Sequence, residues 1–380
     1  MTTSGNRVLD RRPRARQVEW RRRGKSAILS LPPAEGTEIL VSITRRVFAI
    51  AVAGFVLLQA EARAQTQPQA AIAPVAVKVD ARPLEAFDLR DRTRRRFGQL
   101  DFRSGLILTS SFKAFGGLSA FRLDAKGEGF IAMNDKGDWF TGRLVYNGKA
   151  LAGLADVQSA PMLGSDARPI TTKKMFDSES LAIDGMTLYV GIERSNRILK
   201  FDFRQGGISS LGEEIVVPPG IRRLPFNKGP EGLVFVPKGM PNEGALIVVS
   251  ERGLDASGNL IAFLIGGAKP GQFSIRRTAE FDISDAALLP SGDLLILERK
   301  FSLLGGVGIR IRKIPLRAIT PGALVDGPSI FDADLGYEID NMEGLDVHRT
   351  ADGEIVLTMI SDDNFSLLQR TLLLQFTLVE

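Results

Sequence analysis

Carboxylates recur at two places in a repeated segment of this sequence, a pattern that can bind a hard metal ion or activate water. The first set begins each segment and comprises Glu179, Glu231, Asp285 and Glu343, with Gly116 in place of a fifth acid. The second set follows a turn and an apolar run and comprises Asp135, Glu193, Glu251, Glu298 and Asp362. So many carboxylates close together raise one another's pKa unless cations compensate.

Four of the second-set acids are each followed at once by a cation, and these cations are Lys136, Arg194, Arg252 and Arg299. Neighbouring side chains on a strand point in opposite directions, so each cation can face a substrate or pair with an adjacent repeat. The guanidinium groups of Arg194, Arg252 and Arg299 suit phosphate, and these arginines together with Lys136 are the candidate substrate-binding residues. The structural alternative is a set of Arg–Glu pairs that clamp neighbouring repeats together.

The chain has no Cys and a single His, which excludes thiolate and His-cluster metal sites. An oxygen-only site favours Ca²⁺, with Mg²⁺ second. The predicted metal ligands are Glu179, Glu231, Asp285, Glu343, Asp135 and Asp362. The predicted catalytic carboxylates, which would position or deprotonate water, are Glu251, Glu193 and Glu298. A Ser-His-Asp hydrolase is disfavoured, because His348 is the only base available and no G-x-S-x-G elbow occurs.

Five repeats must position these side chains, and their starts lie 63, 52, 54 and 58 residues apart. Each start is followed by a Gly-bearing turn and then by an apolar run, the mark of a β-hairpin. The predicted second strands are Phe130–Met133, Thr187–Ile192, Ala245–Val249, Leu294–Leu297 and Ile355–Ile360. The predicted third strands are Arg197–Phe203, Leu260–Ile265, Gly308–Ile314 and Thr371–Leu378.

The repeats predict an all-β fold, a single β-propeller of five four-stranded blades. A sixth blade could occupy the long first interval or residues 75–100. The last repeat stops after its third strand, so the N-terminal run Gly105–Thr109 is expected to close the ring. In such blades the start of the first strand and the end of the second meet on one face, which gathers both sets of carboxylates near the axis.

The positive charge of the chain belongs to its N-terminal part. Residues 1–64 hold 12 Lys and Arg against 5 Asp and Glu, whereas the rest holds 37 against 39. This distribution disfavours nucleic-acid binding. Residues 1–43 are predicted to be a basic unstructured leader, and the true start of the chain is expected nearer Val41.

Residues 44–64 resemble a twin-arginine (Tat) export signal. Arg45-Arg46 precedes the apolar run Val47–Leu58, which is too short for a stable membrane anchor, and the small-x-small site at Ala64 suggests cleavage before Gln65. The alternative is a buried helix after a basic tail. The processed chain is therefore expected to be periplasmic or secreted, without a membrane anchor. Residues 65–84 are predicted to be a linker and residues 85–380 the propeller.

The motifs, taken in order, resemble the phytase-like family, often described as "esterase-like activity of phytase" proteins. The resemblance covers about residues 85–380 and rests on Gly116-Gly117-Leu118-Ser119, Asp177-Ser178-Glu179-Ser180-Leu181, Gly229-Pro230-Glu231-Gly232-Leu233, Ser250-Glu251-Arg252-Gly253 and Asn341-Met342-Glu343-Gly344-Leu345. It implies an exported propeller that hydrolyses phosphate or other esters, with a small-molecule ester or phosphoester as partner.

Two other functions stay open. The acidic face could bind a ligand or a partner without catalysis, since the fold does not determine the function. It could also resemble calcium-dependent lactonase propellers, which place Glu, Asn and Asp around one ion. The dense calcium-and-phosphate motifs of β-propeller phytases are missing from the sequence, which disfavours phytate as substrate. A monomer is expected.

Overall fold

The computed structural model describes residues 72–173, 175, 177–302 and 306–379. The predicted leader, the export signal and the cleavage site lie outside these residues. No helix in the described part of the chain is long and apolar enough to cross a membrane.

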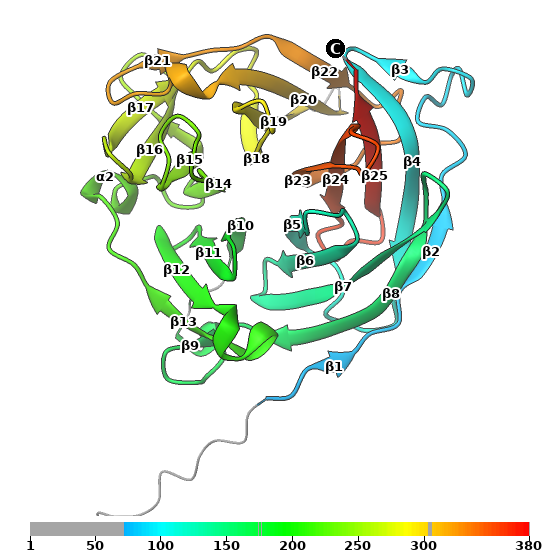
Figure 1. Cartoon of the computed structure of the whole chain (residues 1–380), viewed down its shortest axis with the longest axis horizontal. Helices are drawn as coiled ribbons and strands as arrows, with labels where there is room; N and C mark the ends of the chain where they lie inside the picture. Colours follow the sequence, from blue (N-terminus) through cyan, green and yellow to red (C-terminus); the bar gives the residue numbers. More distant parts are fainter. Residues whose placement is uncertain (1–71, 174, 176, 303–305, 380) are drawn as a thin grey trace, which may run out of the picture. The chain divides into compact units, whose positions relative to one another are not determined.

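Five antiparallel sheets surround a central axis as the blades of a five-bladed β-propeller, and this confirms the predicted fold (Figure 1). Blade 1 contains β5 (Leu118–Leu123), β6 (Gly129–Asn134), β7 (Asp138–Asn147), β8 (Ala150–Pro161) and the edge strand β1 (Val75–Ala76). Blade 2 contains β10 (Ser178–Asp184), β11 (Thr187–Ile192), β12 (Arg197–Asp202), β13 (Leu211–Glu214) and the edge strand β9 (Leu163–Gly164). Blade 3 contains β14 (Pro230–Phe235), β15 (Ala245–Leu254), β16 (Leu260–Gly266), β17 (Gly271–Ile275) and the edge strand β21 (Leu324–Val325).

Blades 4 and 5 complete the ring. Blade 4 contains β18 (Asp282–Leu288), β19 (Asp293–Ser302), β20 (Gly306–Pro315) and β22 (Ser329–Ala333). Blade 5 contains β23 (Asn341–Arg349), β24 (Ile355–Asp362), β25 (Thr371–Leu378), β4 (Leu100–Thr109), β2 (Asp80–Pro83) and the short β3 (Arg96–Phe97). The short helices between strands are η1 (Ile170–Lys173), η2 (Phe203–Gln205), η3 (Gly207–Ser209), α2 (Pro219–Arg222) and η4 (Leu316–Ala318).

The N-terminal strand β4 closes the ring as predicted, because it pairs antiparallel with β25 along its whole length. Residues 75–100 do not form a sixth blade. They supply β1, β2 and β3 to the outer sides of blades 1 and 5. The described part of the segment predicted as a linker, residues 72–84, contains β1 and β2.

The first strand of every blade lies innermost, so β5, β10, β14, β18 and β23 surround the axis (Figure 1). Tight turns join these strands to their neighbours. Gly185, for example, has a φ of 58° in the two-residue turn between β10 and β11, a backbone conformation that glycine adopts readily.

The apolar core lies between the blades rather than in one central mass. Each of the five buried clusters in the described chain joins two adjacent sheets. One of them packs Trp139 and Met133 of blade 1 against Val190 and Phe201 of blade 2. Because apolar side chains fill the interfaces between the sheets, the polar ends of the inner strands remain available for a site near the axis.

Candidate functional site

Every inner strand carries a β-bulge near one end, and the bulge presents one extra side chain. The pairing register with the second strand skips a single residue in each blade. The skipped residues are Ser119, Glu179, Glu231, Ser284 and Glu343. A bulge re-aims the local side chain, and here it supplies three glutamates from three blades.

The second strand of each blade contributes a further side chain directly outside the bulge. These residues are Asp135, Glu193, Glu251, Arg299 and Asp362. Together with the bulge glutamates they line a cavity of about 830 Å³. Within the described part of the chain, ten carboxylates and five Lys or Arg side chains line this cavity, so the formal charge of this lining is strongly negative.

Blade 4 departs from the predicted pattern by one residue in both strands. Its bulge residue is Ser284 rather than Asp285, and the cavity position of its second strand holds Arg299 rather than Glu298. A shift of one residue turns a strand side chain to the opposite face. Asp285 and Glu298 are therefore fully buried away from the cavity, in structural ion pairs.

The Asp285 carboxylate accepts two hydrogen bonds from Arg122, at 2.6 and 2.8 Å. It also accepts from the backbone N–H of Leu345, so the pair joins blades 1, 4 and 5. Glu298 accepts hydrogen bonds from Arg310 at 2.8 Å and from Arg312 at 2.6 and 2.8 Å. Both acids have their charge satisfied by these partners, and neither is placed to hold a metal or to activate water at the cavity.

Arg299 lies among the carboxylates of three blades. It donates to Glu343 and to Asn341, and its guanidinium lies 3.6 Å from Glu251 and 3.9 Å from Glu231. Burial lowers the pKa of Arg299, but these carboxylates outweigh it and hold the pKa above its usual value. Arg299 is therefore a fixed positive charge inside an acidic cluster.

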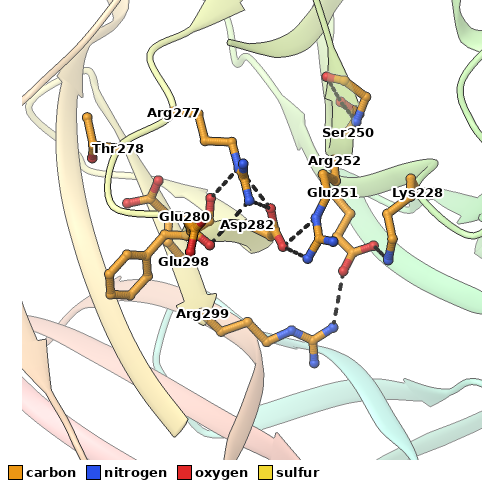
Figure 2. A network of polar contacts seen from close by, with 12 residues as sticks. Lys228, Ser250, Glu251, Arg252, Arg277, Thr278, Glu280, Asp282, Glu298 and Arg299 are labelled. Carbon is orange, nitrogen blue, oxygen red and sulfur yellow. Dashed lines mark hydrogen bonds and ion pairs between the residues drawn. The ribbon is translucent and has the colours of Figure 1, made fainter. Parts of the chain in front are cut away.

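Three other cavity cations, Arg252, Lys228 and Arg194, pair with carboxylates of neighbouring segments. Arg252 and Arg277 both bind Asp282, and Arg299 reaches Glu251 (Figure 2). Lys228 binds Glu251, and Arg194 lies 2.7 Å from an oxygen of Asp177. Lys136, a predicted substrate-binding residue, lies over the ring of Phe365 and does not line the cavity.

Burial and mutual repulsion raise the pKa of most of the acids. Burial, reinforced by repulsion from Glu343 and Asp177, holds the pKa of Glu179 well above its usual range. Burial, reinforced by repulsion from Glu179 and Glu343, holds the pKa of Glu231 well above its usual range too. Burial raises the pKa of Glu343 to about 8, although Arg299 opposes the shift.

Two acids of the second strands, Glu193 and Asp362, behave similarly. Burial, with repulsion from Glu251, raises the pKa of Glu193 to about 7. Burial, with repulsion from Asp135, raises the pKa of Asp362 to about 7. The five cations therefore do not neutralise the cluster, which retains protons near neutral pH or requires further positive charge.

The donor set suits a hard cation, because it consists of carboxylate and amide oxygens. Glu231 Oε2 and Asp135 Oδ1 are buried and have no hydrogen-bond partner among the described residues. In that part of the chain, however, no group of three or more Asp, Glu or His side chains is already arranged to hold a metal ion.

Of the thirteen residues predicted for the site, the structure brings ten to the cavity, namely Asp135, Glu179, Glu193, Arg194, Glu231, Glu251, Arg252, Arg299, Glu343 and Asp362. Their roles in catalysis, substrate binding and metal binding stay predictions. His348 pairs with Val356 farther along β23 and does not line the cavity.

Sequence reasoning missed several polar residues that lie just before the bulges. Asp177, Lys228 and Asp282 line the cavity and bind Arg194, Glu251 and Arg252 respectively. The signal was available, since each precedes a bulge residue by two or three positions.

Comparisons with solved structures find matches at low similarity. Myxococcus xanthus glutaminyl cyclase matches with a TM-score of 0.37 and 11% identity over 70% of this chain and 93% of the other. A nidogen/laminin complex matches with a TM-score of 0.37 and 10% identity, over 74% and 88% of the two chains. YCF48 bound to D1 peptide matches with a TM-score of 0.32 and 10% identity, over 64% of each. Likeness at this level carries no information on function.

A search of curated proteins finds no match. A family model for the phytase-like domain, described as "Esterase-like activity of phytase", matches residues 113–365. The matched segment contains all ten cavity residues named above, and both the propeller fold and the family are compatible with a hydrolase. The chain belongs to the phytase-like family.

Proposed function

We propose that the chain is an exported, metal-assisted ester hydrolase that acts on phosphate esters. The observation that carries the proposal is the excess of buried carboxylates over cations around one cavity of about 830 Å³. A cluster of this kind is costly to bury without compensating charge, so stability alone does not account for it. The "esterase-like activity" in the family description supports the reaction class.

Glu179, Glu231 and Glu343 are the residues that would hold Ca²⁺, with Asp362 and Asp135 as further oxygen donors. The unpartnered Oε2 of Glu231 and Oδ1 of Asp135 fit this role, since buried carboxylate oxygens need a partner. When bound, the ion would supply positive charge that polarises a phosphoryl oxygen. Because these side chains do not already converge, metal binding would draw them together.

The side chains of the second strands would perform the proton and anion chemistry. Glu193 has a pKa of about 7, so it can take a proton from an attacking water at neutral pH. Glu251 is the alternative base, held in place by Lys228. Arg299, Arg252 and Arg194 would hold the phosphate oxygens, since planar guanidinium groups bind phosphate well.

Export is part of the proposal and rests on the sequence of residues 44–64. The arginine pair, the short apolar run and the small-x-small site support passage by the Tat route, with cleavage between Ala64 and Gln65. The processed protein would then act in the periplasm or outside the cell. N-terminal sequencing of protein recovered from the periplasmic fraction tests this step.

The reaction is tested with purified protein and simple phosphomonoesters and phosphodiesters, with added Ca²⁺ and with a chelator. We expect turnover that the chelator abolishes and Ca²⁺ restores. Glu231→Gln keeps the shape of the side chain and should lose both Ca²⁺ binding and turnover. Glu213→Gln, at an exposed position of β13 in blade 2, is the matched control and should behave as the wild type.

Turnover of phosphoesters that persists unchanged in chelator, or in Glu231→Gln, would contradict the metal assignment. Activity on lactones but not on phosphoesters would favour the calcium-dependent lactonase reading. If folded protein hydrolyses neither class of ester, the site binds a ligand or partner without catalysis.

A further inference from the structure

The cavity has two chemically different sides. Its apolar lining residues are Phe301, Val307, Leu335, Ile339 and Leu368. All five belong to blades 4 and 5 or to the connection between these two blades. Among the residues that the structure describes, blades 1 to 3 contribute only charged and amide side chains to the lining.

Three of the apolar residues are well exposed at the cavity. The exposed fraction is 72% for Phe301, 59% for Leu335 and 94% for Leu368. A single exposed leucine is ordinary, but three large apolar side chains lining one cavity form a surface that gains free energy when it is covered. Because they line the same cavity as the carboxylates, the occupant that covers them is a ligand that also reaches the ionic part.

The strand β19 connects the two sides directly. Arg299 and Phe301 are two residues apart on this strand, which stays in regular register with β20 from Asp293 to Ser302. Side chains two apart lie on the same face of a strand, at a spacing of about 7 Å. The aliphatic stem of Arg299 and the Phe301 ring therefore follow one another along one face of the strand. Lys300, between them, lies over the ring of Phe281 instead.

From this arrangement we infer that the substrates are amphiphilic esters, in which one phosphate group is joined to an apolar alkyl or aryl alcohol. The phosphate would lie at Arg299, and the alcohol would lie along Phe301, Leu335 and Leu368. This inference deepens the proposed function and rests on it. Ten lining carboxylates against five cations disfavour a polyphosphorylated substrate, since each additional phosphate would meet further negative charge.

The reaction would be a hydrolysis with a simple balance. Water attacks phosphorus, a new P–O bond forms, and the bond from phosphorus to the ester oxygen breaks. The leaving alkoxide takes up a proton and departs as the apolar alcohol, while inorganic phosphate remains. No oxidant, reductant or further reactant is needed.

The test uses a homologous series of alkyl phosphates, from methyl to octyl phosphate, in both binding calorimetry and turnover assays. For the wild type we expect affinity and kcat/KM to rise by about two- to fourfold for each methylene that the apolar side covers. The heat-capacity change on binding should become more negative along the series, which is the mark of apolar burial.

The double variant Phe301→Ser/Leu335→Ser tests the assigned surface. Octyl phosphate should bind about tenfold more weakly to it than to the wild type, whereas methyl phosphate should bind equally well. Met186→Ser removes an apolar side chain of comparable exposure, 52%, from the β10–β11 turn, which does not line the cavity. This control should keep the chain-length dependence of the wild type.

Calorimetry separates the failure of this inference from failure of the proposed function. If alkyl phosphates bind with the expected chain-length dependence but are not hydrolysed, the proposed catalysis fails and the ligand class stands. An affinity that does not change with chain length, or a dependence that survives in the double variant, overturns the inference. The inference is also overturned if another occupant covers the apolar surface. Such an occupant would be seen as binding of the wild type to lipid vesicles, or as a dimer of the wild type, that is lost in Phe301→Ser/Leu335→Ser.

Discussion

The substitution Glu193→Gln should stabilise the metal-free protein at alkaline pH. Glu193 directly follows β11, the second strand of blade 2, is 3% exposed and accepts a hydrogen bond from the Gly229 backbone N–H at 3.2 Å. A glutamine keeps this acceptor and the shape of the side chain. It removes the negative charge that Glu251 and Asp177 repel.

The expected magnitude follows from the pKa. Burial and then Glu251 raise the pKa of Glu193 from 4.5 to about 7 in the folded protein. Between these values the folded state binds more protons than the unfolded state, so stability falls as the pH rises through this window. Above the folded pKa, the ionised carboxylate costs about 3 kcal/mol. Glu193→Gln should recover a free energy of this order at pH 8 and less than about 1 kcal/mol at pH 5.

The assay is urea unfolding at pH 5 and pH 8 with chelator present, so that no metal masks the repulsion. Glu213→Gln removes an exposed carboxylate of the same blade and should leave the pH dependence unchanged. Equal or lower stability of Glu193→Gln at pH 8 refutes the reasoning, and so does the same gain at both pH values. The variant should also lose ester turnover, since stabilising a strained site commonly reduces activity.

Three further changes probe other parts of the site. Ca²⁺ at a hundredfold excess over its Kd should stabilise the wild type against thermal unfolding by about 2.7 kcal/mol and should hardly stabilise Glu231→Gln. Equal stabilisation of both proteins would mean that the ion binds elsewhere. Arg122→Met leaves the Asp285 carboxylate buried without its cation and should lower the free energy of unfolding in urea by about 3–5 kcal/mol. A smaller loss of stability than that caused by replacing an exposed arginine would show that the Arg122–Asp285 ion pair does not stabilise the ring. Arg299→Gln removes the cation that Glu343 contacts and should lower phosphoester turnover by about a hundredfold, with a larger loss of stability at pH 8 than at pH 5. Unchanged turnover would show that Arg299 does not bind the phosphate.

The sequence carried most of the information about the fold, because each blade repeats a local signal. The predicted strands Thr187–Ile192 and Thr371–Leu378 coincide with β11 and β25. Local hairpin signals set these bounds, and they need no knowledge of distant contacts. Ring closure by Gly105–Thr109 was also predictable, because the last repeat lacked a strand that only the N-terminal part could supply.

The site was less predictable, and blade 4 shows why. Asp285 and Glu298 match the chemical type of their counterparts, but the bulge lies at Ser284 and the cavity position is Arg299. The hairpins differ in length between blades, so the spacing between repeats in the sequence could not reveal that the bulge and the cavity position of blade 4 are each shifted by one residue. The partners that distinguish the positions, Arg122 for Asp285 and Arg312 for Glu298, lie in other strands and become neighbours only after folding.

The pairing of β25 with β4 has a consequence for the time course of folding. It joins Thr371 to Leu108 and Leu378 to Leu100, which are among the most distant partners in the sequence. Contacts between remote segments slow folding, because the loop entropy is lost before the contact is gained. During synthesis, β4 leaves the ribosome early, and the edge of β4 that pairs with β25 stays unpaired until β25 emerges. We therefore expect chains stalled before residue 371 to aggregate through this edge, and cellular chaperones to act on the chain during that interval.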